Sequence, residues 1–148
     1  MEFTDFEREF ARRTLDNLNN FDNQTQNGLS YYEVTQLINS LFGIIIFLNS
    51  KGMVNTNKEI EFYGVSVNWL NKRFKRKSDK NMVGIIRHLR NSLSHGEIIP
   101  NQKEGKIIGF RFSDIDFDTK IKFWQLDLDI RTIRKIAEDL VAAIPKKH

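Results

Sequence analysis

The sequence predicts a mostly α-helical fold, a bundle of about four helices with a small β-hairpin between the third helix and the last. Apolar residues recur at three- and four-residue steps in four stretches, the spacing typical of helices that pack one face on a core. Residues 106–112 and 121–126 are rich in Ile, Phe and Trp and alternate in part, as strands do. Because 148 residues suffice for one hydrophobic core, we expect a single domain over residues 1–148.

Two helices are predicted in the N-terminal third of the chain. The first covers residues 5–20, where phenylalanine and leucine form one stripe. The second begins at Ser30, which forms a capping-box pattern with Glu33, and it ends at residues 49–52. Its apolar residues are so dense that we expect this helix to be central and buried on most sides.

The third helix follows an irregular connection. Residues 53–78 show neither a helical nor a strand period, and we expect one helical turn near residues 67–74. Ser78 or Asp79 can cap the next helix, and Gly96 stands where a left-handed residue would end it. The apolar face of this helix consists of Met82, Ile85, Ile86, Leu89 and Leu93.

A last helix is predicted after the hairpin. Asp127 or Asp129 can cap it, and Pro145 ends it. Its apolar positions repeat helically between these points, so it completes the predicted bundle.

The composition excludes several kinds of chemistry. The chain has no cysteine and only three histidines, so we expect no disulfide, no metal site and no cofactor. The longest apolar run, residues 44–48, is far below the roughly 18 residues of a membrane-spanning helix, and no stretch resembles a secretory signal. We therefore expect a cytoplasmic protein that does not contact membranes.

Positive charge is concentrated before the end of the third helix. The formal net charge is +4, but the segment from Lys72 to Arg90 alone holds eight basic residues and one acid, a net charge of +7. Such a segment attracts polyanions by neutralising phosphates and releasing their counterions. The RNA-binding candidates are Lys72, Arg73, Lys75, Arg76, Lys77, Lys80 and Arg87. The alternative is a solvated basic loop.

The residues best suited to catalysis lie at positions 90–95, with the sequence Arg-Asn-Ser-Leu-Ser-His. His95 can deprotonate a ribose 2′-hydroxyl or protonate the 5′ leaving oxygen, and Arg90 can neutralise charge on a pentacovalent phosphate. In a helix, Asn91 and His95 are about 40 degrees apart, so the Asn91 amide can orient the imidazole, whereas Arg90 and His95 are about 140 degrees apart. Arg90 and His95 can therefore act on the same phosphate only if the helix end is distorted or if a two-fold dimer brings two copies of the helix together.

The spacing has a purely structural alternative. In a random chain of this composition, an arginine followed by asparagine and, five residues after the arginine, by histidine would occur about 0.02 times, so the pattern is moderately specific. A histidine near a helix C-terminus nevertheless interacts well with the helix dipole, and Arg90 could form only a surface ion pair.

The other polar and aromatic candidates are weaker. We expect His88 to be a partly exposed helix residue, and His148 to be without a role at the chain end. Asp114, Asp116 and Asp118 alternate in an acidic stretch without further magnesium ligands. Trp124 is expected in the core or an interface and not as a platform for base stacking.

The motif and its flanks resemble the HEPN domain superfamily, whose nucleases carry arginine, four to six residues, then histidine, often with asparagine directly after the arginine. Here that motif is Arg90-Asn91-Ser92-Leu93-Ser94-His95. Residues 13–18, Arg-Thr-Leu-Asp-Asn-Leu, and 32–41, Tyr-Glu-Val-Thr-Gln-Leu-Ile-Asn-Ser-Leu, are similar to segments of a bacterial, often plasmid-borne HEPN subgroup. The resemblance covers most of the chain.

The resemblance implies a function and partners. It implies a helical bundle of about four helices that forms a homodimer, with metal-independent cleavage of RNA at the dimer cleft as in a toxin or phage-defence effector. Arg90, Asn91 and His95 would be the catalytic residues, and an antitoxin or another regulatory protein could bind. Because the superfamily also contains inactive members, a non-catalytic module that binds RNA, a nucleotide or a partner protein remains an alternative, and so does a structural dimer in which the three residues only bond at the interface.

Overall fold

The structure, a computed structural model, describes residues 12–16, 39–40, 43–45, 47 and 58–144. From residue 58 onward the elements are the 3-10 helix η1 (Ile60–Tyr63), strand β1 (Asn68–Trp69), 3-10 helices η2 (Lys72–Phe74) and η3 (Lys77–Lys80), helix α3 (Met82–Ser94), strands β2 (Ile98–Lys103), β3 (Lys106–Ile115) and β4 (Lys122–Asp129), and helix α4 (Ile130–Ala142).

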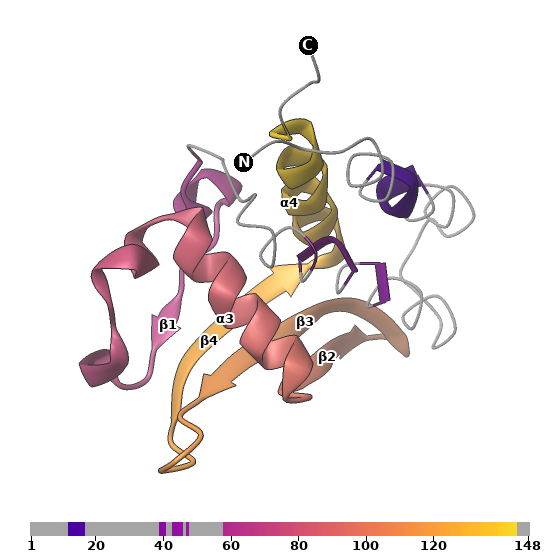
Figure 1. Cartoon of the computed structure of the whole chain (residues 1–148). Helices are drawn as coiled ribbons and strands as arrows, with labels where there is room; N and C mark the ends of the chain where they lie inside the picture. The colour runs from indigo at the N-terminus through magenta and orange to yellow at the C-terminus, as the bar shows by residue number, and fades with distance from the viewer. Residues whose placement is uncertain (1–11, 17–38, 41–42, 46, 48–57, 145–148) are drawn as a thin grey trace.

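An antiparallel sheet of four strands forms the centre of this part of the chain. Its strand order is β1-β4-β3-β2, and α3 crosses one of its faces, as Figure 1 shows. The prediction of a mostly α-helical bundle with a small hairpin is therefore wrong. The fold combines helices with a sheet whose two central strands, β3 and β4, run ten and eight residues.

The two strands that the sequence pattern missed are the edge strands. β2 contains Pro100, which cannot donate a hydrogen bond, and proline is tolerated in an edge strand because one side of the strand has no neighbour. β1 has only two residues, which pair with Gln125 and Trp124 of β4. Neither segment carries an apolar alternation long enough to recognise, because each gains its strand conformation from the neighbour it pairs with.

The face of the sheet beneath α3 is built by alternating residues of the two central strands. Phe110 and Phe112 of β3 pair with Leu128 and Leu126 of β4, and all four are buried. The next position of the same face in β3 is Asp114, which pairs with Trp124. A buried carboxylate therefore continues an apolar row and lies under the helix that carries the Arg-Asn pair.

The third predicted helix is confirmed, with a different cap. Asn81 caps α3 by accepting hydrogen bonds from the N–H groups of Val83 at 3.1 Å and Gly84 at 3.4 Å, in place of the predicted Ser78 or Asp79. At the other end Gly96 has φ +69°, the left-handed conformation expected where a helix stops.

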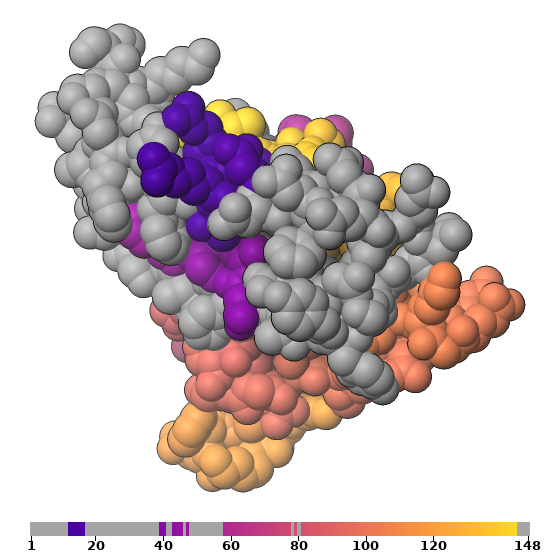
Figure 2. Space-filling model, turned by 90° about the vertical axis from the view of Figure 1, so that its right-hand side faces the viewer, coloured from indigo at the N-terminus to yellow at the C-terminus, as the bar shows by residue number. Residues whose placement is uncertain are grey.

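The remaining helical predictions are confirmed where the structure describes them. Asp129 caps α4 by accepting the N–H of Thr132 at 2.7 Å. Residues 12–16 and the described residues of 39–47 are helical, and residues 12–16 lie beside α4 on the side shown in Figure 2. Ile44 and Ile45 are fully buried, which supports a central second helix. The predicted Ser30 capping box lies outside the described residues.

In its described part, from residue 58, the irregular connection holds the 3-10 helices η1 and η2 and the start of η3, and η2 falls within the stretch where one helical turn was predicted. None of the helices in the described part of the chain combines the length and the apolar character needed to span a bilayer.

Candidate functional site

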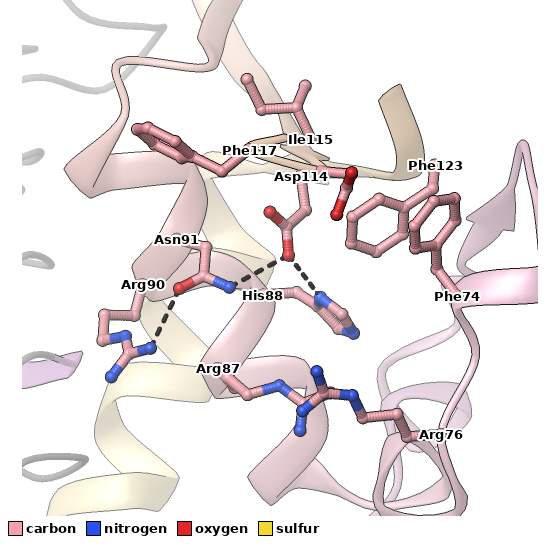
Figure 3. Close-up of a pocket in the computed structure, with 11 residues that line it drawn as sticks. Phe74, Arg76, Arg87, His88, Arg90, Asn91, Asp114, Ile115, Phe117 and Phe123 are labelled. Atoms are coloured by element: carbon pink, nitrogen blue, oxygen red, sulfur yellow. Dashed lines mark hydrogen bonds and ion pairs between the residues drawn. The ribbon is translucent and has the colours of Figure 1, made fainter. Parts of the chain in front are cut away.

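Helix α3 presents the Arg-Asn pair toward a pocket beside the sheet. The pocket has a volume of about 290 Å³, and its wall comes from η2, α3, the ends of β3 and β4 and the turn between them. It is lined by Phe74, Arg76, Arg87, His88, Arg90, Asn91, Asp114, Ile115, Asp116, Phe117 and Phe123. Figure 3 shows Arg90 and Asn91 side by side, with the carboxylate of Asp114 directed at Asn91 and His88.

Arg90 is connected to the sheet through two hydrogen bonds in series. Its Nη2 donates to Oδ1 of Asn91 at 3.0 Å, and Nδ2 of Asn91 donates to Oδ2 of Asp114 at 3.1 Å. Arg90 and Asn91 are both half-buried, so water only partly competes with these bonds. These two bonds fix the orientation of the Asn91 amide, because only the amide oxygen can accept a hydrogen bond from arginine and only the amide nitrogen can donate one to a carboxylate.

His95 lies at the pocket rim and not in its wall. It is the C-cap of α3, its backbone N–H donates to the carbonyl of Asn91 at 3.0 Å, and its side chain is exposed. The imidazole packs edge-on against Phe117 with 4.8 Å between ring centroids, and Phe117 does line the pocket. The predicted hydrogen bond between the Asn91 amide and the imidazole is absent, because Asn91 bonds Arg90 and Asp114 instead.

The prediction that His88 is partly exposed is wrong. The residue is 2% exposed, and its ring lies between two carboxylates: Nδ1 is 2.7 Å from Oδ2 of Asp114 and Nε2 is 2.9 Å from Oδ1 of Asp79. The ring stacks on Trp124, with 4.8 Å between centroids. Both ring nitrogens are therefore within hydrogen-bond distance of a buried carboxylate oxygen.

Asp79 joins the basic segment to this buried group. Its Oδ2 accepts the backbone N–H of Arg76 at 2.7 Å, and its Oδ1 accepts from Nη2 of Arg87 at 2.6 Å as well as from His88. The side chain of Asp79 is fully buried. The single acid of the basic segment therefore attaches that segment to α3.

The RNA-binding candidates do not all reach the pocket. Arg76 and Arg87 line it, together with Arg90. The other described candidates have exposed side chains on η2 and η3 or next to them: Lys72, Arg73, Lys75 and Lys77. Lys80 belongs to η3, but its side chain lies outside the described part of the structure.

The three alternating aspartates have separate environments. Asp114 is buried in the hydrogen-bond chain, and Asp118 is exposed in the turn after β3. The hydroxyl of Thr119 donates to Asp116, as does its N–H, and these bonds together with nearby Arg73 hold the pKa of Asp116 below its ordinary value. Among the described residues no group of three or more acidic or histidine side chains could hold a metal ion.

Sequence reasoning missed His88, Asp79, Asp114 and Phe117 as parts of the site. A signal for His88 was available, since it shares one helical stripe with Ile85, Leu89 and Ser92, all of them buried. Trp124 is fully buried, so its predicted place in the core is confirmed, while His148 lies outside the described residues.

A helix that presents arginine and asparagine to a basic pocket, and a histidine at its end, has the motif of a HEPN domain. The sequence model of the family HEPN pEK499 p136 matches residues 1–148, so the chain belongs to this HEPN family. The resemblance to HEPN domains is thereby confirmed. A search of characterised proteins and a search of solved structures each found no match.

Proposed function

We propose that this protein is a metal-independent endoribonuclease, an effector of the toxin or phage-defence kind. The observation that carries the proposal is the guanidinium of Arg90, held by Asn91 at the wall of an open pocket that Arg76 and Arg87 also line. Among the described residues Arg90 has no acidic partner, so its charge is available to a phosphate. Family membership supports a HEPN domain, and the cleavage itself is our proposal.

The reaction needs three groups. His95 removes the proton of a ribose 2′-hydroxyl, the 2′-oxygen attacks the adjacent phosphorus, and the bond from phosphorus to the 5′-oxygen breaks while the leaving 5′-oxygen takes a proton from water. Arg90 stabilises the extra negative charge of the pentacovalent phosphate, and Asn91 fixes the guanidinium that does so. The products are a 2′,3′-cyclic phosphate and a 5′-hydroxyl, and DNA is resistant because it lacks the nucleophile.

A homodimer supplies the histidine and the arginine to the same phosphate. The helix remains regular through Ser94, so the distortion that could aim Arg90 and His95 together within one chain is absent. An isologous contact between two copies of α3 would place His95 of one copy at the pocket of the other. The exposed ring of Phe117, which touches both His95 and the pocket, suits such a contact.

The experiment is RNA cleavage by purified protein, with and without a chelator. We expect the parent to cut single-stranded RNA equally in EDTA and in magnesium, and His95→Ala to lose cutting by about 10²-fold or more. Arg131→Ala, an exposed arginine of α4, is the matched surface control. Failure of the parent to cut, or equal cutting by His95→Ala, overturns the catalytic proposal.

A second candidate is a module that binds RNA without cleaving it. The observation that favours it is the place of His95, which lies outside the pocket wall and has no hydrogen bond from Asn91. Its signature is RNA binding that weakens with salt, yields no product and is unchanged by His95→Ala.

A further inference from the structure

We infer that His88 and Asp114 are positioning residues for Arg90, acting through Asn91. The inference rests on the proposed function. Neither side chain has to contact RNA. Together they set the position of the Arg90 guanidinium. The observations are four hydrogen bonds in one line, which lead from Asp79 through His88, Asp114 and Asn91 to Arg90.

Asp114 links the buried hydrogen bonds of this chain to those that face the pocket. Its Oδ2 lies 2.7 Å from Nδ1 of His88 and accepts the Asn91 amide at 3.1 Å, so one oxygen serves both. Strand β3 holds the Asp114 backbone, because Asp114 pairs with Trp124 of β4, directly before the register shifts at Ile115. A carboxylate on a paired strand residue therefore sets the orientation of an amide on a helix.

His88 holds Asp114 from the opposite side. Aromatic rings confine the imidazole on three sides: it stacks on Trp124 and meets Trp69 and Phe123 edge-on at 5.7 and 5.8 Å between centroids. The ring cannot turn without losing these contacts and the bond to Asp79. The orientation of Asp114, and so of Asn91, is thus locked by groups that RNA does not need to contact.

Two substitutions at position 88 separate positioning from packing. The amide nitrogen of asparagine is as many bonds from Cβ as Nδ1 of histidine, so His88→Asn keeps a donor for Asp114 and loses the one for Asp79. His88→Gln places its amide nitrogen at the level of Nε2 and keeps the donor for Asp79 alone. Each variant loses one of two buried bonds, so both should lose stability to a similar degree.

The two variants should differ in catalysis. We expect kcat of RNA cleavage to fall by less than about threefold in His88→Asn and by about 10- to 100-fold in His88→Gln, with little change in KM. Asp114→Asn should behave as His88→Gln does. Ser92→Ala is the structural control, because the Ser92 hydroxyl donates to the carbonyls of His88 and Ser113 in the same interior but has no bond to Asn91. It should lower the melting temperature and leave kcat unchanged.

A readout without catalysis keeps this inference distinct from the proposed function. The side-chain amide resonances of Asn91 and the guanidinium resonances of Arg90 should shift in His88→Gln and Asp114→Asn and stay near the parent positions in His88→Asn. If the parent cuts no RNA but these shifts occur, the ribonuclease proposal fails and positioning stands. Equal shifts in both His88 variants, or kcat losses that follow the melting temperature in all four variants, overturn the positioning role.

Discussion

Asp139 of α4 and Asp79 of η3 each accept several hydrogen bonds, and their surroundings differ. Asp139 accepts from the Tyr63 hydroxyl at 2.7 Å and from the Lys58 ammonium at 3.0 Å, which joins η1 to α4. Lys135, one turn before Asp139 on the same helix, completes this group at 3.4 Å. We call these four residues the α4 cluster.

The hydrogen bonds that begin at Asp79 extend further through the molecule than those around Asp139. Asp79, His88 and Asp114 form a hydrogen-bonded group with side chains at most 4% exposed, whereas the Asp139 side chain is 13% exposed and those of its lysine partners Lys58 and Lys135 are 38% and 53% exposed. From Asp114 the hydrogen bonds lead on to Asn91 and Arg90 in the pocket wall. We call Asp79, His88 and Asp114 the α3 cluster. The difference teaches that a buried hydrogen-bonded group can serve more than stability when its last member meets an open pocket.

The largest expected effect comes from removing the imidazole at the centre of the α3 cluster. His88→Leu leaves the buried carboxyl groups of Asp114 and Asp79 each without one hydrogen-bond partner, so we expect a loss of about 3–5 kcal/mol in the free energy of unfolding. Urea denaturation measures it. A loss below about 1 kcal/mol would show that these buried hydrogen bonds stabilise the fold no more than an exposed ion pair does.

The next effect distinguishes Arg90, to which the α3 cluster leads, from the α4 cluster by activity. Arg90→Ala should reduce kcat of RNA cleavage by about 10²- to 10³-fold while the protein stays folded, because the transition-state charge loses its donor. Asp139→Asn in the α4 cluster should keep the parent kcat. The comparison breaks down if Asp139→Asn loses as much activity as Arg90→Ala.

The α4 cluster should respond to pH through stability alone. Burial acts to raise the pKa of Asp139, but the hydrogen bonds from Tyr63 and Lys58 outweigh it and hold the pKa below its ordinary value. The stabilisation is therefore present above the ordinary carboxyl pKa of about 4 and is lost as pH falls through the lower folded value. Asp139→Asn should cost about 1–2 kcal/mol at neutral pH and less in acid, as urea unfolding at the two pH values would show. An equal loss of stability at both pH values would contradict a lowered pKa of Asp139 in the folded protein.

The same cluster affects Tyr63 in the opposite direction. Burial, with the hydrogen bond to Asp139 and its negative charge, raises the pKa of Tyr63 above its ordinary value. Tyr63 therefore remains a donor throughout the neutral range.

The smallest effects are expected at the exposed basic residues. Lys75→Ala and Lys77→Ala should each weaken RNA binding a few-fold at low salt and reduce the slope of log affinity against log salt by about 0.7, since each removes one phosphate contact. Lys103→Ala, exposed on β2 at the far edge of the sheet, is the control. If all three variants bind RNA with the same affinity and the same salt dependence, the basic segment does not bind RNA.

Local spacing in the sequence determined the helices and the motif. The apolar stripe predicted α3, Gly96 predicted its end, and Asp129 predicted the start of α4, because helices form from contacts three and four residues apart. The Arg-Asn pair was recognisable for the same reason, since its residues are neighbours. These features need no knowledge of the rest of the chain.

Tertiary structure decided the sheet and the surroundings of the motif. β1 and β2 are strands because β4 and β3 pair with them. The partners of β1 lie far along the chain, and β2, although it forms a hairpin with β3, has no apolar alternation of its own. Asp114 lies 26 residues after His88, and Asp79 lies nine before it, so only the fold could place one imidazole between two carboxylates. The sequence by itself supplied the arginine; long-range packing supplied the groups that hold it in place.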